Sequence, residues 1–210
     1  TLRIIRKMFS FAVKRGVLDA SPCVEIDPPA EENERDRILT EEEIKRFWFG
    51  LDRAKMSEGT RAVLRLLLIT AQRKGELSQA KWSEVDLKSG WWTVPKEKSK
   101  NKRIHRVPLP PIAIDIFKQA KAIAGDSRWV FPSCKDQPIT PRSISRAIRN
   151  NSEKKSSDNH KHTPPYGDFF QMNHFTPHDL RRTATNMMTS SGISEFDVSK
   201  VLNHTIQSVT

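Results

Sequence analysis

Apolar residues recur along much of this chain at intervals of three and four, which is the period of a helix with one buried face. Near the start, for example, Leu2, Ile5 and Phe9 follow this period, and Gly16 then ends it. A short helix is expected to begin at Glu76. The other predicted helices are residues 2–14, 40–54, 60–70, 111–124, 140–149, 177–191 and 194–203.

The middle of the chain carries the signals of a small sheet, with β-branched and aromatic residues between turn residues. The predicted strands are residues 83–87, 91–94 and 103–109. Lys88-Ser89-Gly90 gives the first two a tight turn. Trp82, Trp91 and Trp92 are expected to pack on this sheet rather than stack on a ligand. The pattern therefore predicts an α+β fold that is mostly α, with three short strands.

A stiff, polar segment separates the first helix from the rest. Ser21-Pro22 and Pro28-Pro29-Ala30 restrict the backbone, and residues 31–36 form a charged run that packs poorly. We therefore divide the chain into residues 1–30 and residues 31–210. The first residues already have a mid-helix pattern, so we expect the chain to begin inside a longer protein.

The net charge of +11 is concentrated in one part of the chain. Residues 37–210 hold thirty Lys and Arg against eighteen Asp and Glu, whereas residues 1–36 hold six against seven. An excess of positive charge of this size favours binding to a polyanion, most simply DNA. No apolar run approaches the roughly 20 residues of a membrane span, and no signal peptide is visible.

The cysteine and histidine pattern argues against a metal site. Cys23 and Cys134 lack paired spacing, which favours a reducing compartment and disfavours structural zinc. A long polar loop is expected at residues 150–173. It holds His160 and His162, with His174 at its end, at a spacing that fits no helix pair. We expect neither a metal nor another cofactor.

The stretch from Phe175 to His204 carries the most informative chemistry. Thr176, Pro177 and Asp179 form a helix start. His178 and Arg181, three residues apart on that helix, share a face, and such a pair near a helix N-terminus suits an anion such as a phosphate. The other side of this helix is expected to join the core through Leu180, Ala184, Met187 and Met188.

Three motifs in a fixed order identify a family. The chain reads TAQRKGEL at residues 70–77, His178-Asp179-Leu180-Arg181, and then Leu202-Asn203-His204. Each motif is weak alone, but their order and spacing resemble the tyrosine recombinases, the integrases of phages and genomic islands. The resemblance covers nearly the whole chain. It implies a catalytic domain with a three-stranded antiparallel sheet over residues 31–210, preceded in residues 1–30 by the end of a core-binding domain and its linker.

The resemblance also implies roles for individual residues. The arginines Arg73 and Arg181 would hold a DNA phosphate, which is why no metal is needed. His178 and His204 would add hydrogen bonds, and Glu76 would orient Arg73 or His178. A lysine in the basic loop at residues 95–102 would protonate the leaving 5′-oxygen. Lys100 matches this position best, with Lys98 and Lys102 as alternatives.

Further basic residues are candidates for DNA contact. They are Lys96, Lys98, Lys102 and Arg103 in the basic loop, and Arg142 and Arg146, with Arg149, on the helix from residue 140. An ordinary solvated face explains the three arginines equally well. The resemblance implies duplex DNA at recombination sites as the partner, a homotetramer on DNA, and DNA-bending or excision proteins as accessory factors.

The nucleophile is the gap in this pattern. The family has a tyrosine shortly after its last histidine, whereas this chain ends at Thr210, six residues after His204. Its sole tyrosine, Tyr166, lies in the polar loop. We expect a missing C-terminal segment to supply the tyrosine, and the chain as given to be inactive. Two other functions stay open: DNA relaxation of the type IB topoisomerase kind, and DNA binding without catalysis.

Overall fold

The computed structural model describes residues 2–24, 26, 36–152 and 166–204. It divides into two units, Thr1–Asp36 and Arg37–Thr210. The expected boundary between residues 30 and 31 lies outside the described residues. Helix α1 (Leu2–Lys14) is the main element of the first unit, with the bounds that the apolar period predicts. That this unit is the end of a core-binding domain stays a prediction.

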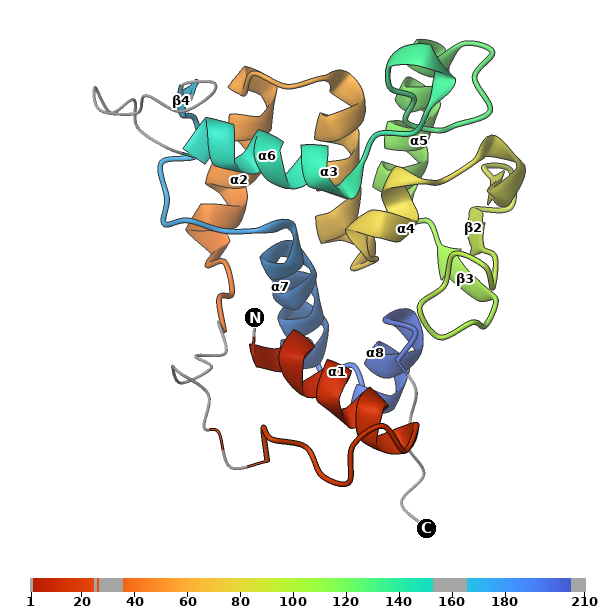
Figure 1. The fold of residues 1–210 in the computed structure, drawn as a ribbon. Helices are drawn as coiled ribbons and strands as arrows, with labels where there is room; N and C mark the ends of the chain where they lie inside the picture. Colours follow the sequence, from red (N-terminus) through yellow and green to blue (C-terminus); the bar gives the residue numbers. More distant parts are fainter. Residues whose placement is uncertain (1, 25, 27–35, 153–165, 205–210) are drawn as a thin grey trace. The chain divides into compact units, whose positions relative to one another are not determined.

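The second unit is mostly helical and has a small three-stranded sheet, which lies at one side of the helices in Figure 1. Its helices are α2 (Glu41–Arg53), α3 (Glu58–Thr70), α4 (Lys74–Ser78), α5 (Pro111–Ala124), α6 (Pro141–Ser152), α7 (Pro177–Ser190) and α8 (Glu195–Val201), with 3-10 turns η1 (Trp82–Glu84) and η2 (Cys134–Asp136). The strands are β1 (Val85–Asp86), β2 (Trp91–Val94), β3 (His105–Pro108) and a short β4 (Gly167–Asp168). None of the described helices is long and apolar enough to cross a membrane. The predicted fold class is confirmed.

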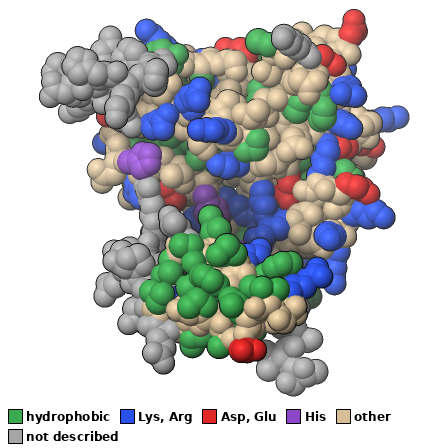
Figure 2. Space-filling model, in the orientation of Figure 1, with side chains coloured by type: hydrophobic (Ala, Val, Ile, Leu, Met, Phe, Trp, Pro, Cys, Tyr) green, Lys and Arg blue, Asp and Glu red, His purple; other side chains and the backbone are tan. Residues whose placement is uncertain are grey.

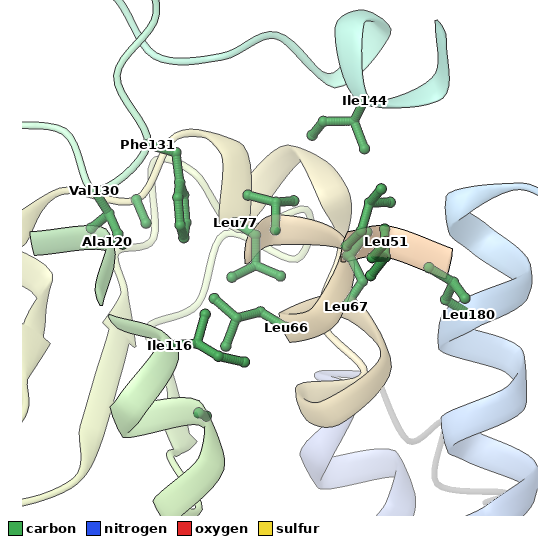
Figure 3. Close-up of a cluster of buried hydrophobic side chains, with 14 of the residues drawn as sticks. Leu51, Leu66, Leu67, Leu77, Ile116, Ala120, Val130, Phe131, Ile144 and Leu180 are labelled. Carbon is green, nitrogen blue, oxygen red and sulfur yellow. The ribbon is translucent and has the colours of Figure 1, made fainter. Parts of the chain in front are cut away.

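Helix α3 is the centre of this unit. It is apolar on several sides, so it packs against α2, α4, α5, α6 and α7 rather than facing water on one side. Leu66 and Leu67 on α3 are buried between Ile116 of α5 and Leu180 of α7 (Figure 3). Because α3 is held on all sides, the turn at its C-terminal end has a fixed position.

The sheet is antiparallel in the order β1-β2-β3, with Trp92 opposite Val107. Trp92 is fully buried and Trp82 packs on the core edge-to-face with Phe117, as expected. Trp91 is only half-buried and is covered by the guanidinium of Arg106, 4.4 Å from the ring centroid.

Three expectations, two about strands and one about the polar loop, gave those segments more residues than the structure does. The first strand was predicted at residues 83–87, but the Glu84 N–H donates to the Lys81 carbonyl at 3.0 Å, which makes a 3-10 turn there, and the Glu84 carboxylate accepts the Lys81 N–H at 3.2 Å. The third strand starts later than predicted, because Lys102 has a left-handed φ of 53° and closes the preceding turn. The polar loop begins later too, since α6 continues to Ser152 and the fully buried Asn151 binds the backbone of Lys55 at 2.7 and 3.2 Å.

An aromatic cluster fixes where α7 begins. Phe170 and Phe175 meet edge-to-face at 5.3 Å, and both pack on Phe47 of α2. The helix start predicted at Thr176, Pro177 and Asp179 is confirmed, and it takes the form of a capping box in which the Asp179 carboxylate accepts the Thr176 N–H at 2.8 Å. These contacts set the position of the α7 N-terminus relative to α2 and α3.

The prediction for the buried side of α7 is partly wrong. Leu180 and Ala184 are buried and Met188 packs beside them, but the Met187 side chain is 49% exposed. Met187 lies over an apolar groove with Ile44 and Trp48 instead of entering the core.

Close packing of α2 on the aromatic cluster gives a stability test. A Cβ added at Gly50 would lie 2.8 Å from the carbonyl oxygen of Phe169 and 2.9 Å from a ring carbon of Phe170. Because backbone cannot yield cheaply, we expect Gly50→Ala to lower the free energy of unfolding by about 1–3 kcal/mol in urea titrations.

Gly59→Ala is the matched control, since its added Cβ would meet nothing closer than 3.7 Å within helix α3. It should leave stability unchanged or raise it by up to about 1 kcal/mol. Equal effects of the two substitutions would contradict the packing described.

Candidate active site

The turn between α3 and α4 presents Arg73. Helix α3 ends at Ala71, whose left-handed φ of 54° turns the chain sharply, and Arg73 then caps α4. The carboxylate of Glu76 is almost fully buried and accepts from Arg73 Nη1 at 3.1 Å and from the Arg73 N–H at 3.4 Å. A buried carboxylate in this place holds the guanidinium in one direction. Of the two partners considered for Glu76, the structure brings it to Arg73.

Arg181 enters the same region from α7. Its guanidinium is 5% exposed and donates to the carbonyl of Ala71 at 2.6 Å and to that of Leu202 at 2.7 Å. The same group therefore joins the α3–α4 turn to the end of α8. Carbonyl oxygens orient the guanidinium without neutralising its charge, so an anion placed beside it would be stabilised.

His204 follows α8 and lies against Arg181. Its Nε2 is 3.3 Å from Arg181 Nη2. A guanidinium has only donors, so Nε2 must accept in this contact, and the imidazole is then the neutral form with its proton on Nδ1. Asn203, just before it, has a left-handed φ of 51°, which turns the chain at the end of α8.

The predicted residues meet around one cavity of about 320 Å³. Its walls are formed by Gln72, Arg73, Lys74, Lys100, Pro177, His178, Arg181 and His204. Five of the six residues predicted to act in catalysis line this cavity, and the sixth, Glu76, lies behind Arg73. Residues separated by more than a hundred positions in sequence are thus brought together at the ends of α3, α7 and α8.

The cavity is electropositive, and the pKa values of three of its titratable side chains are lowered. Burial, followed by the charge of Arg73, lowers the pKa of Arg181 to about 10, so the group stays charged at neutral pH. Burial also lowers the pKa of His178 and of His204, with nearby arginines adding to both shifts. Both imidazoles are therefore neutral near pH 7. A bound phosphate would offset the repulsion among these groups.

The structure distinguishes among the three candidate lysines. Lys98 Nζ forms an ion pair with Glu84 at 2.5 Å and also donates to the carbonyl of Gln79, with its side chain 17% exposed. Lys102 is exposed and lies outside the cavity wall. Lys100 is exposed and lines the cavity. Geometry thus favours Lys100, although its role stays a prediction.

A second, larger cleft of about 480 Å³ adjoins the cavity and shares Lys74, Pro177 and His178 with it. This cleft is lined by Arg142, Arg146 and Arg149 of α6 and by His174. Figure 2 shows Lys and Arg side chains gathered on the face over which α6 runs in Figure 1. The three α6 arginines therefore face a common hollow, beside the cavity. Lys96 and Arg103 are exposed on the β2–β3 side, whereas Lys98 is occupied by Glu84.

Three residues of this region were missed in the sequence. Gln72 is fully buried and its amide donates to the carbonyls of Thr70 and Val201 at 2.7 and 2.9 Å. His105 is buried on β3, 3.1 Å from the same Val201 oxygen, and burial lowers its pKa. The alternation of buried and exposed positions along β3 could have found His105. Lys74 donates to the Ser145 hydroxyl at 2.8 Å. Nothing in the sequence pattern marks Lys74 as a site residue apart from its position next to Arg73.

Tyr166 lies away from the cavity. Its backbone N–H binds the carbonyl of Asn150, and its ring lies 5.9 Å from the Lys55 ammonium. It is not among the residues of the cavity wall. Of the three histidines considered as metal ligands, His160 and His162 lie outside the described residues, and His174 lines the α6 cleft.

The chain is similar to known proteins in sequence and in fold. Residues 37–210 match the model of the phage integrase family. The prophage integrase IntZ of Escherichia coli K12 is 30% identical over 149 residues, which cover 70% of this chain and 37% of that protein. The tyrosine recombinase XerC of Xylella fastidiosa strain 9a5c is 26% identical over 194 residues, which cover 91% of this chain and 60% of that protein.

A solved structure shares the fold. The crystal structure of a lambda integrase(75-356) dimer bound to a COC′ core site matches with a TM-score of 0.70 at 18% identity, covering 100% of this chain and 72% of that one. The chain belongs to the phage integrase family of tyrosine recombinases, and its residues 37–210 are the part that the family model matches. The chain spans only 37% and 60% of the two curated relatives described above.

The lowered histidine pKa values predict how stability depends on pH. The pKa values of His105, His178 and His204 are lower in the folded chain than the ordinary value of 6.5. As the pH falls below 6.5, these side chains therefore take up protons more readily in the unfolded chain than in the folded one. The free energy of unfolding should therefore fall as pH drops below about 6.5, and urea titrations across that range would measure it.

His105→Gln is the variant that isolates one contribution. Its amide can still donate to the Val201 carbonyl but does not titrate, so the decline with acidification should be shallower. If the free energy of unfolding of the unsubstituted chain rose as the pH was lowered, the environments assigned to these histidines would be contradicted.

Proposed function

We propose that this chain is the catalytic part of an enzyme that cuts and rejoins DNA at specific sites, for integration or excision of a mobile element. The observation that carries the proposal is the cavity itself. Arg73, Arg181, His178, His204 and Lys100 converge on it from the α3–α4 turn, from α7, from the end of α8 and from the β2–β3 loop. Family membership of the chain supports this use of the cavity.

The scissile phosphate of duplex DNA would occupy the cavity. Arg73, oriented by Glu76, and Arg181 would donate to its non-bridging oxygens, and their charge would stabilise the extra negative charge of the transition state. The guanidiniums are fixed before substrate arrives, so little reorganisation is needed when the reaction occurs. This supplies the charge that a metal ion supplies in other phosphoryl-transfer enzymes.

Proton transfer would use the neutral and charged groups at the edge of the cavity. His178 is neutral near pH 7 and exposed at the mouth, so it suits acceptance of a proton from an attacking tyrosine hydroxyl. Lys100 would protonate the leaving 5′-oxygen. The tyrosine would become joined to the 3′-phosphate, and the 5′-hydroxyl of a partner duplex would later displace it.

The described residues supply the phosphate site without the nucleophile. Tyr166 packs beside Lys55 and not in the cavity wall, so we propose that the tyrosine comes from a segment beyond Thr210. The 210 residues alone would then bind DNA without cutting it.

The partners are proposed by analogy with solved relatives. One is a lambda integrase tetramer bound to a Holliday junction, at 19% identity and a TM-score of 0.70. We propose a homotetramer on two DNA sites for the complete protein, with DNA-bending or excision proteins as accessory factors. Along the duplex, Lys96, Lys102 and Arg103 would contact the backbone on one side, and Arg142 and Arg146 on the other.

Two other functions have distinct outcomes. A topoisomerase of type IB would relax supercoils without exchanging strands, and a DNA-binding protein without catalysis would form no covalent product. Covalent capture on nicked DNA, followed by relaxation and strand-exchange assays, separates the three.

Duplex binding by the chain should depend steeply on salt. If about five phosphates are contacted, log K should fall against log salt with a slope of roughly −4 to −5, measured by fluorescence anisotropy. Joint Arg142→Gln and Arg146→Gln should make the slope shallower, because two phosphate contacts are lost. Lys118→Gln is the control, since Lys118 lies exposed on α5 beside Asp115. A slope that the α6 substitutions leave unchanged would mean that these arginines are merely solvated.

Cleavage needs a chain extended past Thr210 by a tyrosine-bearing segment. Incubated with nicked duplex, this extended chain should give a protein–DNA band on SDS gels, while the 210 residues give none. Arg73→Ala should reduce the rate by about 10³-fold or more, as loss of a transition-state arginine does in phosphoryl transfer. Tyr166→Phe should have no effect, and a band from the 210 residues that Tyr166→Phe abolishes would make Tyr166 the nucleophile.

The role of Lys100 has a chemical test in the same extended chain. Lys100→Ala should slow cleavage by about 10²- to 10⁴-fold, the usual contribution of a positioned acid. A 5′-sulfur leaving group needs no proton, so it should recover most of the rate. Recovery in Lys102→Ala but not in Lys100→Ala would move the role to Lys102.

A further inference from the structure

The two residues that flank Lys100 are bound to one and the same residue. The Oγ of Ser99, a side chain that is 5% exposed, accepts from Asn203 Nδ2 at 2.9 Å. On the other side, the Asn101 amide donates to the backbone carbonyl of Asn203. A short span of the β2–β3 loop, centred on Lys100, is therefore fastened to Asn203 at both ends.

Asn203 itself belongs to a rigid segment. The carbonyl of Val201 is bound by Gln72 at 2.9 Å and lies 3.1 Å from the His105 ring nitrogen. The carbonyl of Leu202 is bound by Arg181 at 2.7 Å. Groups from the α3–α4 turn, β3 and α7 thus hold the end of α8. The loop residues bound to Asn203 are therefore held in a fixed position.

The loop has a second anchor before Lys100. Lys98 is held by Glu84 and by the carbonyl of Gln79, and its ammonium lies 5.6 Å from the centroid of the Trp129 ring. With Lys98 fixed on one side and Asn101 on the other, Lys100 has a restrained backbone and an exposed side chain. Restraint of this kind lowers the entropy lost when the ammonium is brought to a reacting atom.

We propose that Asn203 is a positioning residue that holds the Lys100 loop in register with His204. His204 follows it directly and touches Arg181, so the proton donor and a phosphate-contacting histidine are set by a single residue. The proposal rests on the proposed function, because it assigns Lys100 to the leaving oxygen. It predicts that the loop and the end of α8 move as one body.

The choice of asparagine at this position fits two demands. Its φ of 51° lies in the left-handed region, which glycine adopts freely and which asparagine tolerates better than most residues. Glycine would keep this backbone but would lack the amide that binds Ser99. Asn203→Gly therefore removes the contact with Ser99, keeps the backbone carbonyl that Asn101 binds, and leaves the turn intact.

The first experiment measures the fastening in the 210-residue chain itself. Hydrogen exchange of the amides from residues 96 to 102 should be at least several-fold faster in Asn203→Gly. Ser99→Ala breaks the same contact from the other side and should have a similar effect, with the double variant no faster than either single one. Gln171→Gly is the matched control, because Gln171 also has a φ of 51° but is exposed away from the cavity. Unchanged loop exchange in Asn203→Gly would overturn the proposal.

The second experiment tests positioning for catalysis in the extended chain. Asn203→Gly should slow cleavage of the oxygen substrate about 10- to 100-fold, a part of the usual contribution of a positioned acid. The 5′-sulfur substrate should be cut within about threefold of the unsubstituted rate, since it needs no proton from Lys100. Equal losses on both substrates would show general damage and overturn the positioning role. An unsubstituted extended chain that cuts neither substrate would instead overturn the proposed function, while the exchange result would still report on the fastening.

Discussion

The arrangement of this site depends on one buried guanidinium. Arg181 lies on α7 and donates to the carbonyls that end α3 and α8, so three helices meet at a single charged group. Burying a charge is costly unless it is hydrogen-bonded, and here the hydrogen bonds go to neutral carbonyl oxygens. The charge is thereby oriented but not cancelled. The fold keeps a positive potential at the cavity that a phosphate can complement.

Much of this architecture could be predicted from the sequence because its signals are local. The period of apolar residues gave α1 and α5 with their observed bounds, and Thr176, Pro177 and Asp179 predicted the start of α7. The ordered motifs placed Arg73, His178, Arg181 and His204, which the fold then brings to one cavity.

The remaining features depend on contacts between distant parts of the chain. Gln72 and Val201 are 129 positions apart, and Asn101 and Asn203 are 102 apart, so no periodic pattern marks either pair. Lys98 looked like one more member of a basic loop, but Glu84 lies close enough to pair with it. Met187 has a core-like position on its helix and is nevertheless exposed, beside an apolar groove that Ile44 and Trp48 also line. Local sequence propensity determines neither which distant residues bond to each other nor which side chains are covered by other elements.

Positive charge is thus used in two ways within one region. Arg181 and Arg73 are held rigidly by carbonyls and by Glu76, which suits the precise orientation of one phosphate. The arginines of α6 line a broader neighbouring cleft, which suits contacts along the adjacent DNA backbone. Lys74 lines both hollows and gives them a common border.

The most direct test of this account is a crystal structure of the chain with duplex DNA that carries its recombination site. We predict one backbone phosphate within hydrogen-bonding distance of both Arg73 and Arg181, with Lys100 Nζ near the bridging 5′-oxygen. Phosphates confined to the α6 cleft, with the cavity of Arg73 and Arg181 holding none, would contradict it.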